Sequence, residues 1–296
     1  MSPSLCLGTA QFGLSYGITN TNGQVSEVEV AHLLYEANSF GIRYLDTAQS
    51  YGNSEEVLGR NLPTGHKFRI GSKLSAQSQF SFSSSDIDVW EKNFHSSCKR
   101  LGLNSLDYLL LHSPADLKKK GSDYLIRWLS QLRNRGLVDR IGLSIYTSDD
   151  LEGIDLDLLD LVQLPLSLFD QRLLKDGTIY SLNSRGINVH ARSLYLQGIL
   201  LTPPSKLPDW VGAQMRNHHT ELETLAQKKN CRLVDLALGF AKVQNDLEAV
   251  VVGLCSSKEL LDLKIGWEAN SPWDYREWEN WSLQDPNILD PRRWPT

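Results

Sequence analysis

The sequence predicts one closed (β/α)8 barrel, in which eight parallel strands alternate with helices along the chain. Short apolar runs alternate with longer amphipathic stretches almost to the end of the 296 residues. One run, 106–111, is apolar at nearly every position, which is typical of a strand buried on both faces. An open doubly wound sheet would fit the same local pattern. No GxGxxG motif follows any expected strand, however, and the number of units suits closure, so the barrel is favoured.

The expected strands are short apolar segments, at 5–7, 42–45, 68–72, 106–111, 140–143, 161–164, 188–191 and 249–252. The expected helices carry apolar residues at helical spacing, at 28–40, 54–62, 86–101, 123–135, 149–153, 175–185, 213–229, 234–244 and 257–266. In the first helix, Ser26 is the expected N-cap and Gly41 the stop. In the second, Ser54 is the expected cap, and Glu55 and Glu56 in the first turn suit the helix dipole.

Residues 1–266 are expected to form the barrel, and residues 267–296 differ from it in kind. They are expected to form an irregular tail that lies on the barrel, in the right place to close over an active site. The tail carries five tryptophans among prolines and acids: Trp267, Trp273, Trp278, Trp281 and Trp294. Their flat indole rings could stack on sugar faces, or they could pack the tail onto the helices, which is the favoured role for most of them.

Composition excludes several classes of partner. A net charge of −5 offers no electrostatic footprint for nucleic acid. The four cysteines are scattered and form no CxxC pair, which argues for a reducing compartment and against a thiolate metal site. The N-terminal residues show no secretory signal pattern, and no uninterrupted apolar stretch approaches the length of a membrane span. We therefore expect a cytoplasmic protein without nucleic-acid or membrane partners.

Barrel enzymes place their chemistry at the carboxyl ends of the strands. The residues at the expected strand ends are Gly8, Thr9, Ala10, Asp46, Lys73, His112, Ser144, Gln163, Arg192, Ser193 and Gly253. Asp46, Lys73 and His112 end successive strands, so they are expected to be neighbours around the rim. Tyr51 lies on the loop after the second strand and can lean inwards. These four residues are the candidate catalytic set.

The four candidates suit the protonation of a developing alkoxide. A free tyrosine has a pKa of about 10, and a nearby ammonium lowers the pKa of a phenol by favouring the phenolate. Lys73 can supply that charge to Tyr51, and Asp46 is the natural partner of Lys73. His112 could orient a substrate oxygen. Each residue alone has a structural explanation, as a turn cap, a rim aromatic, a solvated lysine or a core histidine, but four at successive strand ends weaken those explanations together.

The motifs that hold these residues resemble the aldo-keto reductase family. They are LDTAQSYGNSEEVLGR, GSK around Lys73 and LLLHSP around His112, and the similarity runs from residue 8 to about residue 260. The resemblance implies NAD(P)H-dependent reduction of a small-molecule carbonyl compound. Tyr51 would be the general acid, Lys73 the group that lowers its pKa, Asp46 the support for Lys73, and His112 the substrate-orienting residue. The runs GLSIY, VQLPLSLFDQR and RSLYLQGILL resemble a bacterial subgroup associated with sugar or polysaccharide metabolism.

The same resemblance implies a set of cofactor-binding residues. Ser144 and Gln163 match the partners of the nicotinamide amide. The other implied contacts are Gly8, Thr9, Ala10 and Asp46, the pyrophosphate loop with Arg192, Ser193, Leu194, Gln197 and Gly198, and the adenosine-phosphate loop with Gly253, Leu254, Cys255, Ser256 and Ser257. That last loop leads into a helix N-terminus, which is a ready anion site.

The chain departs from the family pattern at several cofactor positions. Ile145 replaces an asparagine that joins Ser144, and Arg192 replaces an aromatic residue that stacks on the nicotinamide. Cys255 replaces a frequent arginine near the 2′-phosphate, and Leu263 replaces an adenine-contacting asparagine. The neighbouring Lys258 could compensate for the lost arginine, although a solvated lysine is an equal explanation. We expect NADPH as cofactor, with NADH as the alternative.

Two other functions compete with a reductase. A cofactor-binding redox sensor or accessory subunit would hold the nucleotide with little turnover, but it would not need the proton donor that Tyr51 provides. A metal-dependent barrel hydrolase would need ligands at metal-binding spacing, and no such cluster of His and Asp is present in the sequence. His218 and His219 are adjacent on an expected helix and cannot easily present both rings to one ion.

Overall fold

A computed structural model gives the fold and describes residues 2–18 and 20–295. Eight parallel strands pair in chain order, and the last pairs with the first, so the sheet closes into a barrel. The strands are β1 (Ser4–Gly8), β2 (Tyr44–Asp46), β3 (Arg69–Leu74), β4 (Leu106–Leu111), β5 (Val138–Ser144), β6 (Leu161–Pro165), β7 (Asn188–Arg192) and β8 (Ala249–Gly253). Each lies within two residues of its expected bounds. The predicted barrel is confirmed.

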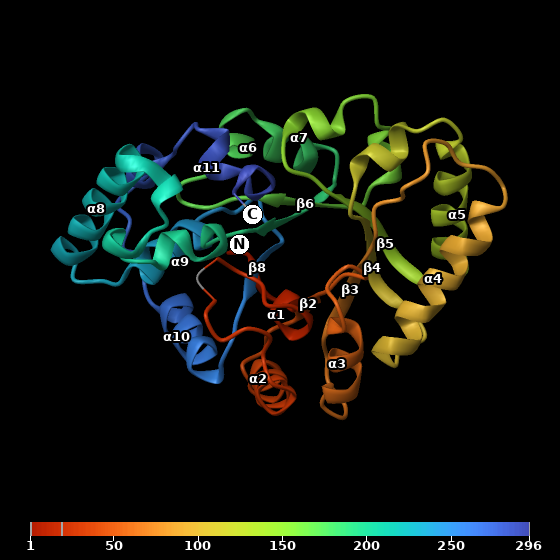
Figure 1. Cartoon of the computed structure of the whole chain (residues 1–296), viewed down its shortest axis with the longest axis horizontal. Helices are drawn as coiled ribbons and strands as arrows, with labels where there is room; N and C mark the ends of the chain where they lie inside the picture. The colour runs from red at the N-terminus through yellow and green to blue at the C-terminus, as the bar shows by residue number, and fades with distance from the viewer. Residues whose placement is uncertain (1, 19, 296) are drawn as a thin grey trace.

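Helices surround the strands, as Figure 1 shows, with α2 beside α3 at one side and α8, α9 and α10 grouped at another. The α-helices are α1 (Ala10–Gly13), α2 (Glu27–Ser39), α3 (Ser54–Asn61), α4 (Asp86–Leu101), α5 (Ser122–Asn134), α6 (Arg172–Lys175), α7 (Thr178–Ser184), α8 (Gly212–Lys228), α9 (Leu233–Lys242), α10 (Ser257–Glu268) and α11 (Pro286–Leu289). Short 3-10 helices lie in the connections: η1 (Pro114–Lys118), η2 (Ser148–Leu151), η3 (Leu156–Leu158), η4 (Leu196–Leu201), η5 (Pro204–Lys206), η6 (Asp209–Val211), η7 (Glu277–Trp281) and η8 (Pro291–Arg293).

Three local expectations were wrong. The helix expected at 175–185 is divided into α6 and α7, because Gly177 takes a φ of +81° that breaks the helical hydrogen bonds. The segment expected as a helix at 149–153 is the 3-10 helix η2. Asn53, and not Ser54, is the N-cap of α3. The Ser54 hydroxyl instead donates to the Thr9 carbonyl at 2.7 Å, which ties the start of α3 to the end of β1.

The core has an inner and an outer part. Side chains of six strand residues fill the barrel itself: Cys6, Tyr44, Tyr108, Leu110, Leu161 and Ala249. A larger apolar cluster lies between the strands and the helices. The amino-terminal end of the barrel is closed by Glu248, which accepts hydrogen bonds from Tyr44, Arg140 and His190. The open end of the barrel is therefore the carboxyl end of the strands.

The tail after α10 packs on the barrel through backbone contacts and buried indoles. The Trp273 Nε1 donates to the Leu236 carbonyl, and the Leu283 N–H donates to the Phe169 carbonyl. Trp273, Trp278 and Trp294 are all less than a tenth exposed. These three tryptophans therefore pack the tail, as was favoured from the sequence. In the part of the chain that the structure describes, none of the helices combines the length and the apolar character needed to cross a membrane.

Candidate active site

The centre of the candidate site is an ion pair between Lys73 on β3 and Asp46 at the end of β2. The Lys73 Nζ donates to Asp46 Oδ2 at 2.5 Å and to the Thr47 carbonyl at 3.1 Å. The two side chains are only 1% and 4% exposed. Burial opposes the charge on Lys73, but Asp46 and Tyr51 beside it leave the pKa of Lys73 raised above its ordinary value. Lys73 is therefore an ammonium ion held inside the protein.

Tyr51 lies beside this ammonium on the loop between β2 and α3. Its ring centroid is 5.0 Å from Lys73 Nζ. The loop turns at Gly52, whose φ of +56° favours glycine, and it packs against α1, where Gly13 has no side chain. A Cβ on Gly13 would lie 1.9 Å from the Tyr51 carbonyl oxygen. The position of Tyr51 thus depends on the close approach of two backbones.

His112 follows β4 and completes the group. Its ring meets that of Tyr51 edge to face, with centroids 5.9 Å apart. The Ser50 hydroxyl lies 3.1 Å from its Nδ1. Burial, together with the positive charges of Lys73 and Arg192, lowers the pKa of His112 to about 4. His112 is therefore neutral at physiological pH and can act as a hydrogen-bonding group without a charge.

A cavity of about 840 Å³ opens over these residues at the carboxyl ends of the strands. Most residues that were expected to bind substrate or cofactor line it: Gly8, Thr9, Ala10, Asp46, Tyr51, His112, Ser144, Gln163, Arg192, Ser193, Leu194, Gln197, Gly198, Gly253, Leu254 and Cys255. Lys73 lies behind Asp46 and Tyr51 and does not line the cavity. The volume is in the range of small-molecule and cofactor sites.

Ser256 and Ser257, expected as phosphate contacts, do not line the cavity. The Ser256 hydroxyl accepts the Glu259 N–H and caps α10. The Ser257 N–H donates to the Glu29 carboxylate, which reaches it from α2. These groups are thus engaged within the protein at the start of α10, whereas the Ser257 hydroxyl oxygen is buried without a hydrogen-bond partner among the described residues.

Gln163 and Ser144 offer a fit for the carboxamide of a nicotinamide. The Gln163 Nε2 donates to Asp46 Oδ1 at 2.8 Å, which fixes the amide. Its Oε1 is buried and has no hydrogen-bond partner among the described residues. A buried acceptor of this kind is costly unless a ligand pairs with it. An amide N–H of a nicotinamide would satisfy it, and the Ser144 side chain lines the same cavity.

Arg192 borders the catalytic end of the cavity. Its Nη2 donates to the Ile145 carbonyl at 2.9 Å, and its guanidinium lies 4.1 Å from the ring centroid of Tyr146. From the tail, Arg292 lies on the same ring at 3.9 Å. Tyr146 thus joins the tail to the cavity wall, because it contacts Arg292 and also lines the cavity.

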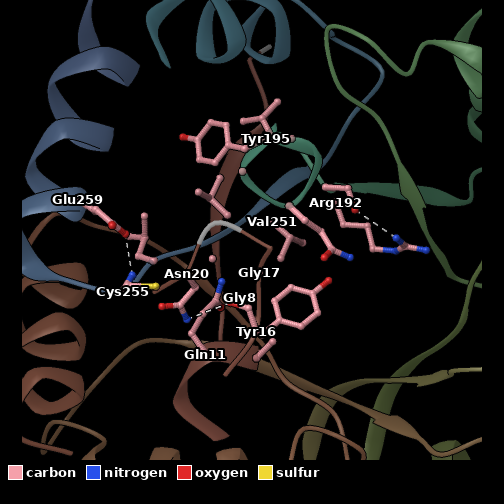
Figure 2. A pocket seen from close by; sticks show the side chains of 18 of the residues that line it. Gly8, Gln11, Tyr16, Gly17, Asn20, Arg192, Tyr195, Val251, Cys255 and Glu259 are labelled. Carbon is pink, nitrogen blue, oxygen red and sulfur yellow. Dashed lines mark hydrogen bonds between the residues drawn. The ribbon is translucent and has the colours of Figure 1, made fainter. Parts of the chain in front are cut away.

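The other end of the cavity is formed by α9 and α10. Figure 2 shows Glu259 and Cys255 on the opposite side of the cavity from Arg192. Arg232, Glu259 and Asp262 are the charged residues at this end. Lys258, considered above as a compensating cation, does not line the cavity.

Several lining residues were not predicted. They are Gln11, Tyr16, Gly17, Asn20, Thr21, Asn22, Tyr146, Leu201, Thr202, Arg232, Leu233, Val234, Val251, Glu259 and Asp262. Those between 16 and 22 lie in the loop from α1 to α2 and have an ordinary loop composition. For α10 a signal was available, because Cys255, Glu259, Asp262 and Leu263 follow one another at helical spacing and so share a face.

The comparisons with known proteins agree on one family. The model of the Aldo/keto reductase family matches residues 4–270. An aldo-keto reductase of Mycolicibacterium vanbaalenii is 30% identical over 194 residues, which are 62% of this chain and 64% of that protein. The match thus spans less than two thirds of this relative's length. The D-arabinose 1-dehydrogenase of Saccharomyces cerevisiae is 26% identical over 255 residues, 79% of this chain and 75% of the relative.

A solved structure supports the same architecture. The holo form of an aldo-keto reductase from Bacillus halodurans superposes with a TM-score of 0.74, over 98% of this chain and 95% of that chain, at 18% identity. This likeness shows a shared fold. With the family match over nearly the whole barrel, we conclude that the chain belongs to the aldo/keto reductase family, whose members are oxidoreductases that act on carbonyl groups with nicotinamide cofactors.

Proposed function

We propose that this chain reduces an aldehyde or ketone to an alcohol with NAD(P)H, and that Tyr51 supplies the proton. The observation that carries the proposal is the buried Lys73 ammonium between the Asp46 carboxylate and the Tyr51 ring. A buried ion pair next to an open cavity is costly for stability, so a role in chemistry is its natural explanation.

The proton leaves from the Tyr51 hydroxyl. As it moves to the substrate oxygen, negative charge develops on the phenol, and the nearby ammonium of Lys73 stabilises that charge. Asp46 keeps Lys73 protonated and in place. The fixed arrangement requires no reorientation of charges during the reaction.

His112 would orient the carbonyl oxygen. With the Ser50 hydroxyl as donor to Nδ1, the His112 Nε2 carries the proton and can donate to the substrate. Its lowered pKa keeps the imidazole neutral, so it does not compete with Tyr51 as the acid.

The cofactor would lie along the cavity from Gln163 to Cys255. When bound, a reduced nicotinamide dinucleotide supplies hydride to the carbonyl carbon. Gln163 and Ser144 would hold its carboxamide, and the loops at 192–198 and 253–255 would line its phosphates and adenosine. The sequence favoured NADPH with NADH as the alternative, and the charges at the α10 end bear on that choice.

The proposed substrate is a small carbonyl compound. Similarity to a sugar dehydrogenase supports a sugar-derived compound. A relative carries the name D-arabinose 1-dehydrogenase, which is a sugar activity of that protein. The barrel (1–266) would carry the chemistry, and the tail (267–296) would shape the substrate end of the cavity through Arg292 and Tyr146.

The test is steady-state oxidation of NADPH and of NADH with a panel of aldehydes and aldoses. Tyr51→Phe should lower kcat by about 100-fold or more while dinucleotide affinity stays unchanged, because only the proton donor is lost. Tyr180→Phe is the matched control, since Tyr180 is 74% exposed on α7 and should behave as wild type. Full activity of Tyr51→Phe would overturn the catalytic assignment. Tight dinucleotide binding without turnover on any carbonyl would favour the redox sensor.

A further inference from the structure

The start of α10 has the backbone donors expected of a phosphate site, but the chain's own carboxylates already use two of them. The Glu259 Oε2 accepts the Cys255 N–H at 2.7 Å, a contact drawn in Figure 2. The Glu29 carboxylate accepts the Ser257 N–H, and the Ser256 hydroxyl accepts the Glu259 N–H. A helix N-terminus attracts anions through its free N–H groups and its dipole. Here two carboxylates take that place before any ligand arrives.

The arginine at this end of the cavity is engaged as well. The Arg232 Nη1 donates to Asp262 at 2.8 Å, and its Nε and Nη2 donate to the two carboxylate oxygens of Asp235 at 3.0 and 2.8 Å. Among the cavity-lining residues contributed by α9, α10 and the residue before α9, as far as the structure describes them, Arg232 is the sole cation. Its charge is balanced by two carboxylates, so it is not available to a phosphate group.

One carboxylate oxygen of Glu259 accepts no hydrogen bond from the described residues. Within the described residues its Oε2 takes the Cys255 N–H, and no hydrogen bond occupies Oε1. A carboxylate in this position can accept a hydrogen bond from the hydroxyl of an adenosine ribose. A 2′-phosphate carries about two negative charges and would be repelled by the carboxylate. The neighbouring Cys255 supplies no positive charge, because its side chain is a neutral thiol.

On these contacts, and given the proposed function, we propose that Glu259 makes the cofactor site selective for NADH over NADPH. The carboxylate accepts from the ribose 2′-hydroxyl and repels a 2′-phosphate. This inference reverses the preference for NADPH expected from the sequence, which relied on Lys258 as a substitute cation. The cause is that Glu29 and Glu259 occupy two of the N–H groups at the α10 start, while Arg232, the lining cation at this end among the described residues, is paired with Asp235 and Asp262.

The experiment is calorimetric titration of the full chain with NADH and with NADPH at low ionic strength. We expect NADH to bind about tenfold or more tightly than NADPH, since like charges separated by a few ångströms are only partly screened. Glu259→Gln keeps an oxygen that can accept the Cys255 N–H but removes the charge. It should raise NADPH affinity about tenfold and lower NADH affinity, because the amide NH2 that remains cannot accept the ribose hydroxyl. Added salt should narrow the wild-type ratio of NADH to NADPH affinity.

Glu268→Gln is the matched control, because it removes the same charge from the far end of α10. Glu268 pairs only loosely with Lys264 and does not line the cavity, so the NADH to NADPH ratio should stay as in the wild type. Equal or tighter binding of NADPH by the wild type would overturn the selectivity and leave the proposed function standing. An unchanged ratio of NADH to NADPH affinity in Glu259→Gln would likewise overturn the selectivity and leave the proposed function standing. Failure to bind either dinucleotide would overturn the proposed function and this inference together.

Discussion

Replacing Gly13 by alanine tests whether the backbone contact under Tyr51 sets the catalytic rate. The new Cβ would lie 1.9 Å from the Tyr51 carbonyl oxygen and 2.4 Å from the Ser54 nitrogen. Ordinary contacts of a Cβ begin near 3.4 Å. The loop that carries Tyr51 must therefore move by about 1 Å or more, and a displacement of that size can lower kcat by about 100-fold. Overpacking should also cost about 2 kcal/mol of unfolding free energy.

Gly59→Ala is the control that separates position from stability. Gly59 lies on α3, the helix that follows the Tyr51 loop, and its Cβ would meet the Arg100 carbonyl oxygen at 2.1 Å. We expect a similar fall in Tm with kcat close to that of the wild type, measured by calorimetry and steady-state kinetics. Two results would refute the reasoning: wild-type kcat in Gly13→Ala, or an equal loss of kcat in Gly59→Ala.

Two further predictions concern stability and pH. Glu248→Gln should lower the free energy of unfolding by about 2 kcal/mol, or roughly 4 °C in Tm, because Arg140 loses its carboxylate, while kcat stays unchanged at the opposite end of the barrel. Burial raises the pKa of Glu248, but hydrogen bonds from His190 and Arg140 bring it down to about 2. The stabilisation is therefore present above about pH 4.5 and is lost as the pH falls towards 2. If Glu248→Gln lost as much stability as the wild type over this pH range, the lowered pKa of Glu248 would be refuted. The pKa of His112 is lowered to about 4 in the folded protein. As the pH falls, His112 is therefore protonated in the unfolded chain near pH 6.5, before it is protonated in the folded protein. Stability should then fall between about pH 6.5 and 4, and His112→Asn should lose less Tm than wild type between pH 7 and pH 5; equal losses would contradict the assigned pKa.

The grouping of the candidate catalytic residues was predictable because it follows from strand order. Asp46 and Lys73 lie in β2 and β3 and His112 directly follows β4, and neighbouring strands of a parallel barrel bring their carboxyl ends together. No comparable rule predicts the bond from Gln163 to Asp46, which joins residues 117 positions apart across the barrel. It depends on the diameter of the closed sheet and on side-chain length.

The start of α10 shows why local chemistry was a poor guide at the other end of the cavity. A serine-rich loop before a helix is typical of an anion site, and the local geometry is indeed a capped helix start. The sequence could not show that Glu29 reaches this start from α2, a contact between residues 228 positions apart. The ion pair of Arg232 with Asp262 likewise depends on how α9 packs against α10. Tertiary contacts of this kind change the sign of the charge that a ligand meets.

The buried pair at the proposed catalytic centre limits which substitutions can reveal the chemistry. Removing either Asp46 or Lys73 leaves an uncompensated charge in a site that is almost closed to water, so such a variant loses stability together with activity. Tyr51 faces the cavity, and phenylalanine would keep a ring in contact with His112 and Lys73. The loss of one hydroxyl then changes proton delivery and little else. Of the three residues, Tyr51 is therefore the one whose substitution measures catalysis separately from folding.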